Sequence, residues 1–223
     1  MTTRGKASAP AKIILFGEHF VVYGNTAILA SINRRITVDA RKTGEEKIAI
    51  KSDIGIAGEY SAGGFKMING GMGTKEALDP LHSAIRRVLS TRKTGIEVNI
   101  SSDIPHGIGL GSSAAACVAT VAAVNSLFQK KSSKQKICNI AIESERMIHV
   151  NSSGADCYVS TFGGLIQYSR KNGFRKISAR GTLALVVTST MVRHSTGDLV
   201  AKVKRFKERN ESLFAALAEQ AAD

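Results

Sequence analysis

The chain has 223 residues, of which 43% are hydrophobic, so it can bury the core of one large domain or of one domain and part of another. Charge or glycine interrupts every apolar stretch well before the ~20 residues that span a bilayer, and the N-terminus lacks a signal-peptide pattern. An odd count of three cysteines without metal-ligand spacing argues against a disulfide framework. We therefore expect a cytoplasmic protein with no membrane partner.

The sequence is strongly basic, with 31 lysines and arginines against 18 acidic residues and a formal net charge of +13. Such an excess is compatible with nucleic-acid binding, and it also suits an enzyme whose substrates carry carboxylate or phosphate groups. The basic residues are dispersed along the chain, and no aromatic stacking motif accompanies them. This distribution disfavours a nucleic-acid partner and favours small anionic substrates.

The first hundred residues contain several strand and loop patterns. Residues 1–8 are polar and are expected to be mobile. Apolar or alternating patterns predict strands, at residues 11–16, 27–40, 47–52 and 95–101. Within the second of these, Arg34 and Arg35 are expected to form a turn. Glycine-rich stretches predict loops at residues 55–64 and 70–73.

Helical patterns begin at residue 78. Apolar or small residues on one face predict helices, at residues 78–90, 112–129, 133–149 and 198–222. Strand patterns return at residues 165–168 and 183–189.

A glycine-rich turn leads directly into the second predicted helix, where residues 104–115 read Ile-Pro-His-Gly-Ile-Gly-Leu-Gly-Ser-Ser-Ala-Ala. A helix N-terminus offers unpaired backbone N–H groups and the positive end of the helix dipole, so these glycines would let phosphate oxygens approach the backbone. Ser112 and Ser113 are placed so that one hydroxyl can cap the helix and the other can reach a phosphate-bound Mg²⁺. The segment has neither the Walker A ending nor the Rossmann spacing. The alternative is an ordinary glycine turn capped by serine.

Two further segments accompany this loop: residues 8–24, Ser-Ala-Pro-Ala-Lys-Ile-Ile-Leu-Phe-Gly-Glu-His-Phe-Val-Val-Tyr-Gly, and residues 152–164, Ser-Ser-Gly-Ala-Asp-Cys-Tyr-Val-Ser-Thr-Phe-Gly-Gly. Together the three segments resemble the GHMP small-molecule kinases, the superfamily of galactokinase, homoserine kinase, mevalonate kinase and phosphomevalonate kinase. Within it, the chain is most similar to the mevalonate kinases. That similarity rests on Lys12 followed by Gly17-Glu18-His19, and on Glu145-Arg146-Met147-Ile148-His149 leading into Ser153-Gly154-Ala155-Asp156.

The resemblance implies the GHMP kinase fold, of the α+β class, in which an N-terminal α/β domain of the ribosomal protein S5 domain 2-like type precedes a ferredoxin-like C-terminal domain. We expect residues 1–179 to form the N-terminal domain that binds ATP and substrate, and residues 180–223 to be an incomplete start of the C-terminal domain. Family members carry a third glycine-rich motif in that second domain, and no late stretch of this sequence matches it. The chain as given is therefore expected to bind Mg·ATP weakly and to turn over slowly or not at all.

The activity that the resemblance implies is ATP-dependent phosphorylation of the primary hydroxyl of mevalonate to 5-phosphomevalonate, an early step toward isoprenoids, with ATP and Mg²⁺ as cofactors. Asp156 would accept the hydroxyl proton, and Lys12 would lie between Asp156 and the γ-phosphate. Ser113 and Glu145 would hold the Mg²⁺. Glu18, His19 and, by a looser match, Thr190 would contact the substrate. The ATP phosphates would be bound by Pro105, Gly107, Ile108, Gly109, Leu110, Gly111, Ser112, Ser113 and Ala114.

Other functions stay open at this point. The acceptor of another GHMP kinase, such as phosphomevalonate, a sugar or homoserine, would fit the same fold. A basic module that binds nucleotide or RNA without catalysis is the alternative outside enzymes. A homodimer is compatible with the resemblance.

Overall fold

The computed structural model describes residues 3–105, 107–147, 152–178, 181, 184–188 and 196–220, with the side chains of the last segment described from residue 199. One sheet forms its centre, made of β1 (Arg4–Phe16), β2 (Ala27–Thr43), β3 (Ile48–Ser52), β4 (Ala57–Ser61), β5 (Gly64–Asn69), β6 (Gly95–Ser102), β7 (Leu165–Ser169) and β8 (Gly173–Ile177). The strand order is β5-β4-β3-β6-β2-β7-β8, and β1 pairs with β2. Only the β3–β6 pair among these is parallel.

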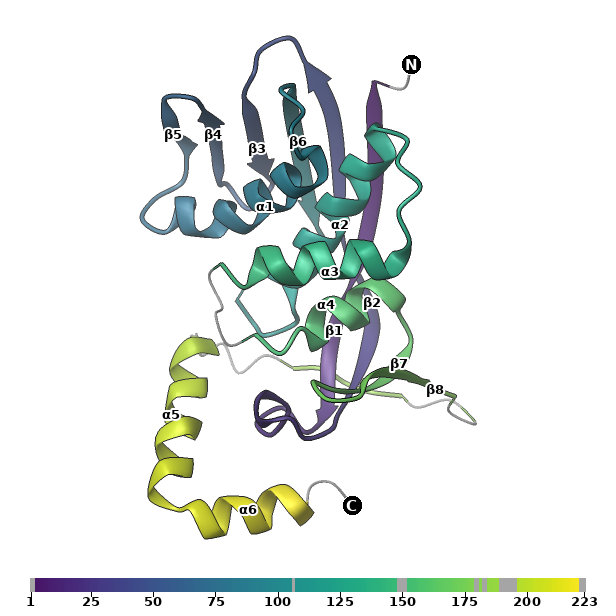
Figure 1. Cartoon of the computed structure of the whole chain (residues 1–223), viewed down its shortest axis with the longest axis vertical. Coiled ribbons are helices and arrows are strands. Elements are labelled where there is room, and N and C mark those ends of the chain that lie inside the picture. Colours follow the sequence, from purple (N-terminus) through teal and green to yellow (C-terminus); the bar gives the residue numbers. More distant parts are fainter. Residues whose placement is uncertain are drawn as a thin grey trace.

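Helices cover one face of this sheet: α1 (Thr74–Leu89), α2 (Ser112–Leu127), α3 (Lys134–Glu145) and α4 (Ala155–Phe162) (Figure 1). The central one is α2, which packs on β1 and β2 and is contacted by the other three helices. Its valines, Cys117 and all its alanines except Ala122 are buried. Small side chains let the helix approach the sheet closely, and Gly5 of β1 permits this, because a β-carbon there would lie 2.3 Å from the carbonyl oxygen of Ala123.

The prediction of a mobile N-terminus is wrong for residues 4–8, which form the first part of β1. The predicted turn at Arg34 and Arg35 is also wrong, because β2 runs through it without a break. The pairing shifts there from Pro10 opposite Arg35 to Ala11 opposite Ile32, which leaves two extra residues in β2 as a bulge. Both segments are polar, and a polar sequence favours the prediction of a loop or a turn. The pairing to a neighbouring strand that overrides this preference cannot be seen in the local sequence.

The region predicted as a glycine-rich loop at residues 55–64 contains β4 and the start of β5, which pair as a hairpin. The glycine at position 58 of β4 leaves room for the ring of Phe65 in β5, because a β-carbon at this position would be 2.4 Å from that ring. β8, which pairs with β7, was not predicted from the sequence. Residues 184–188, within a stretch predicted as a strand, have no regular secondary structure.

The single last helix predicted over residues 198–222 is two helices, α5 (Thr196–Arg209) and α6 (Glu211–Gln220). Asn210 lies between them. Its side-chain amide donates to the backbone carbonyl of Phe206 in α5, and its backbone carbonyl accepts from the N–H of Phe214 in α6. α6 then packs on the 3₁₀ turn η1 (Val21–Tyr23) through the ring of Phe214. None of the helices in the described ranges is both long and apolar enough to cross a bilayer.

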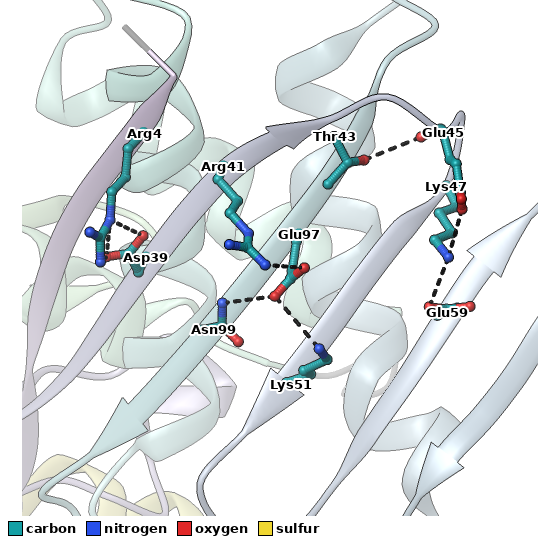
Figure 2. Close-up of polar contacts among 10 residues, drawn as sticks. All are labelled: Arg4, Asp39, Arg41, Thr43, Glu45, Lys47, Lys51, Glu59, Glu97 and Asn99. Carbon is teal, nitrogen blue, oxygen red and sulfur yellow. Dashed lines mark hydrogen bonds and ion pairs between the residues drawn. The ribbon is translucent and has the colours of Figure 1, made fainter.

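The face of the sheet opposite the helices carries a ladder of charged residues that links neighbouring strands (Figure 2). Arg4 of β1 pairs with Asp39 of β2, and Arg41 of β2 pairs with Glu97 of β6 at 2.8 Å. Lys51 of β3 also reaches Glu97, at 3.6 Å. These pairs hold charge on the solvent side, so the apolar side chains of the same strands face the helices.

Candidate active site

Lys12 and Asp156 form an ion pair in the interior of the helix-covered side. The Nζ atom of Lys12 lies 3.2 Å from Oδ2 of Asp156, and their side chains are 9% and 32% exposed. Lys12 comes from the middle of β1, and Asp156 from the first turn of α4. A buried lysine needs a counter-charge, so the aspartate accounts for its position. The partial exposure of the carboxylate leaves it open to a ligand.

The glycine loop lies directly against this lysine. The backbone N–H of Lys12 donates to the carbonyl of Leu110 at 3.0 Å. Gly111 has φ +72°, and a β-carbon there would stand 2.7 Å from Cγ and 2.9 Å from Cε of Lys12. Only glycine allows both this backbone conformation and the passage of the lysine stem. The first and second of the three motifs therefore meet at this point.

Gly111 is the N-cap of α2, and no side chain caps this helix. The prediction that a serine hydroxyl caps it is therefore wrong, since Ser112 and Ser113 are already the first two helical residues. Their hydroxyls, like the backbone N–H groups of this first turn, remain available to a ligand.

Gly107 and Gly109 have φ near +77° and +78° and nothing within 4 Å of a β-carbon position. Of the other predicted phosphate-binding residues, Leu110 and Ala114 are buried, Ile108 is half-buried and Pro105 is exposed.

Glu145 is the last residue of α3 and is only 5% exposed. Its Oε2 accepts from the hydroxyl of Ser152 at 3.4 Å and from the thiol of Cys157 at 3.5 Å. Burial, and after it the negative charge of Asp156, raises the pKa of Glu145 to about 7, while the two hydrogen bonds and the charge of Lys12 oppose the rise. The carboxyl group is thus poised to ionise when a cation approaches.

An apolar cavity of about 310 Å³ opens beside the first turn of α2. Ser112 and Ser113 form one edge of it, and isoleucines and leucines from the turn between β3 and β4, from β6 and from α1 form most of its wall, among them Ile54, Leu78 and Ile100. A flat apolar body can enter such a space while polar groups attached to it reach the helix N-terminus.

Glu18 and His19 lie in an exposed turn after β1, with His19 Nε2 3.9 Å from Glu18 Oε1 and both side chains 55% exposed. Gly17 forms the entry to this turn with φ +83°, its β-carbon position 2.3 Å from the carbonyl of Thr26. Among the described residues, no hydrogen bond or ion pair joins this turn to Lys12 or Asp156. Thr190 and His106 lie outside the described residues.

The chain is similar to known kinases. Residues 76–164 match the family model for the GHMP kinases N terminal domain. The chain is 41% identical to the mevalonate kinase of Pyrococcus furiosus over 213 residues, which cover 92% of this chain and 63% of the relative. It is 36% identical to the mevalonate kinase of Archaeoglobus fulgidus over 206 residues, with 92% and 64% covered.

Residues 76–164 match the GHMP kinases N terminal domain, and the chain as a whole is similar to kinases of that superfamily.

Solved structures of this superfamily superpose on the chain. The L. major mevalonate kinase in complex with R-mevalonate gives a TM-score of 0.76 at 28% identity, with 98% of this chain and 66% of that chain covered. The Methanococcus jannaschii mevalonate kinase gives a TM-score of 0.63 at 29% identity, with 78% and 56% covered. The chain thus spans less than two thirds of the length of the curated mevalonate kinases it matches.

Sequence reasoning missed three parts of the site. Ser152 and Cys157 support Glu145, but a serine and a cysteine after a helix gave no signal for that role. The apolar cavity was missed because its wall combines three elements that are distant in the sequence. Ile54 and Ile56 flanking Gly55 were the only local hint, since an apolar pair at a glycine turn is unusual for an exposed loop.

Proposed function

We propose that this protein transfers the γ-phosphoryl group of ATP to the primary hydroxyl of mevalonate, giving 5-phosphomevalonate. The observation that carries the proposal is the Lys12–Asp156 ion pair, held against the glycine loop at the N-terminus of α2. The similarity to mevalonate kinases, one of them bound to R-mevalonate, supports this choice of acceptor.

Phosphoryl transfer requires that the phosphate be held in line with the hydroxyl, that its charge be neutralised and that the hydroxyl proton be accepted. Asp156 takes the proton at its exposed carboxylate oxygens. Lys12 balances the charge of Asp156 in the ion pair and stabilises the negative charge that develops on the phosphoryl oxygens. The pair therefore serves the acceptor and the phosphate together.

ATP binds along the loop from Pro105 to Ala114 in this proposal. The backbone N–H groups at the N-terminus of α2 donate to the phosphates, and the helix dipole favours their charge. The cavity of about 310 Å³ beside Ser112 and Ser113 takes the adenine, because its wall is mostly apolar and it opens at the same helix end.

Mg²⁺ is held by Ser113 and Glu145 in this proposal. Hydroxyl and carboxylate oxygens are the ligands that Mg²⁺ prefers, and a buried carboxyl with a raised pKa gains its missing counter-charge from a cation. When bound, the ion neutralises charge on the phosphates. The described residues contain no group of three or more acidic, histidine or cysteine side chains that could hold a metal, so Ser113 and Glu145 would hold the ion together with the bound nucleotide.

Glu18, His19 and Thr190 bind the acceptor in this proposal. A histidine donates to a carboxylate or hydroxyl, and a glutamate accepts from a hydroxyl, which together suit a hydroxylated acid.

In this proposal, residues 1–179 form the domain that binds ATP and substrate, and residues 180–223 begin the next domain. Cytoplasmic location and a homodimer stay predictions.

The test is the release of ADP from radiolabelled ATP at high protein concentration, with mevalonate, phosphomevalonate, galactose and homoserine as acceptors. Mevalonate is expected to give the fastest turnover. Faster turnover with another acceptor would keep the kinase and replace its substrate. ATP binding without transfer to any of the four, also when the chain is supplied with a second domain that carries the third glycine-rich motif, would favour the non-catalytic nucleotide-binding module.

A further inference from the structure

The two oxygens of the Glu145 carboxylate are engaged differently. Oε2 accepts two hydrogen bonds, from the hydroxyl of Ser152 at 3.4 Å and from the thiol of Cys157 at 3.5 Å. Within the described residues, no hydrogen bond ends on Oε1. The protein thus occupies one oxygen of this carboxylate and leaves the other to a ligand.

The fold fixes both donors. The hydroxyl oxygen of Ser152 accepts from the backbone N–H of Gly154 at 3.3 Å, which leaves the hydroxyl hydrogen to bond Glu145. Cys157 lies in the first turn of α4 and is fully buried. Glu145 itself is only 5% exposed at the end of α3. A close-packed side chain has little room to rotate, so the same oxygen stays engaged.

Divalent cations differ in how they bind a carboxylate. Mg²⁺ is small and demands a nearly octahedral shell, which a carboxylate bound through both oxygens would distort. Ca²⁺ is larger, takes more oxygen ligands in a flexible geometry and accepts both oxygens of one carboxylate. A carboxylate that offers a single oxygen therefore suits Mg²⁺ and disfavours Ca²⁺.

We propose that Ser152 and Cys157 are positioning residues that make the proposed metal site selective for Mg²⁺ over Ca²⁺. They hold Oε2, so that Glu145 offers a cation Oε1 alone. Hydrogen-bond partners of this kind commonly change the metal affinity of a site by about ten- to a hundredfold. Because Glu145 is a cation ligand only in the proposed function, this role of the two residues rests on that function.

The test measures, by calorimetry, the affinity of the full 223-residue chain for ADP in Mg²⁺, in Ca²⁺ and in a chelator of both. The wild-type chain is expected to bind ADP more tightly with Mg²⁺ than with Ca²⁺. Ser152→Ala should narrow this preference, and its combination with Cys157→Ala should narrow it about tenfold, because both oxygens of Glu145 then become free for Ca²⁺. A purely structural role would weaken ADP binding equally with both cations.

Ser144→Ala is the matched control. Ser144 directly precedes Glu145 and is fully buried, but its hydroxyl donates to the backbone carbonyl of Ile140 at 2.8 Å. Its removal should leave the ratio of the two affinities unchanged. Ser152→Thr keeps a hydroxyl at the same position and should retain the wild-type ratio. Glu145→Gln should remove the preference for Mg²⁺.

The outcomes separate this selectivity from the metal site itself. Equal wild-type affinity with Mg²⁺ and Ca²⁺, an unchanged ratio in the variants of Ser152 and Cys157, or equal narrowing in Ser144→Ala would each overturn the selectivity and leave the proposed function intact. Wild-type ADP binding that is the same with Mg²⁺ and with the chelator would contradict the proposed metal site, and the selectivity with it. Should the double variant not fold, Ser152→Ala and Ser152→Thr decide.

Discussion

Gly111 and Lys12 are in direct contact, and the contact exists only because residue 111 has no side chain. A β-carbon would stand 2.7 Å from Cγ of the lysine. The same lysine reaches Asp156 at 3.2 Å. The loop proposed to bind phosphate and the Lys12–Asp156 pair proposed to take part in phosphoryl transfer therefore meet at this contact.

Gly111→Ala should destabilise the fold by about 2–4 kcal/mol, because it combines a strained positive φ with a clash against the lysine stem. Gly109→Ala is the matched control, since it has a similar φ of +78° and open space around its β-carbon position, so strain of about 1 kcal/mol is expected alone. Urea unfolding of both variants measures the difference. Equal losses of stability would mean that contact with Lys12 contributes nothing.

Glu145→Gln should stabilise the ligand-free protein at pH 8 and have little effect at pH 5. The folded-state pKa of about 7 lies above the ordinary 4.5, so the folded protein holds the proton more tightly than the unfolded chain. Stability is then full below pH 4.5 and falls as the pH rises to about 7, by roughly 3 kcal/mol over a shift of this size. The neutral glutamine avoids that loss.

Chemical unfolding across pH 4–9 checks this prediction. Glu143→Gln, an exposed glutamate on the same helix, is the control and should not show the same pH-dependent gain. A wild-type stability that rises between pH 5 and pH 8, once the control is subtracted, would contradict the prediction for Glu145.

Asp156→Asn should reduce kcat about 10²–10⁴-fold, because asparagine keeps the shape but cannot accept a proton. Lys12→Met should lower turnover to a similar extent, since it removes the charge and keeps most of the stem. Both should still bind ADP, which calorimetry can measure. More than a tenth of the wild-type kcat in Asp156→Asn would exclude this residue as the base.

Phe214→Ala should release α6 from the turn that carries Glu18 and His19. The ring of Phe214 is 6% exposed and lies 5.3 Å from that of Phe20 and 5.0 Å from that of Tyr23, centre to centre. Removing a buried ring costs about 3 kcal/mol or more, so hydrogen exchange should accelerate in η1 and α6. Leu213→Ala, at a position 52% exposed, should leave the exchange unchanged. If both variants exchange alike, α6 does not support the turn.

The sequence was sufficient for those parts of the fold that local pattern determines. The small-residue run from Ser112 predicted α2, and apolar spacing predicted α1, although the helix begins four residues before the predicted start. The hairpin of β4 and β5 was missed, because Gly58 looks like a loop residue and is explained only by the ring of Phe65 from another strand. Tertiary contacts override local preference at such positions.

The candidate site also has one part that the local sequence predicts and another part that depends on tertiary contacts. The motif around Asp156 could be found from the sequence, and the structure brings it to Lys12. The surroundings of Glu145 could not be found, because burial and a neighbouring carboxylate, which raise its pKa, are properties of the folded chain. For Thr190 the described residues give no test.

Lys12 and Asp156 stand near opposite ends of the part of the sequence that builds the sheet and its covering helices. During synthesis the lysine leaves the ribosome early, whereas its counter-charge follows only after α2 and α3 have been made. An intermediate without α4 cannot bury this lysine cheaply, because the ammonium group would have no partner. The part of β1 around Lys12 should therefore stay open in a nascent chain until α4 docks, so that closure of this ion pair reports the docking of α4 on the sheet.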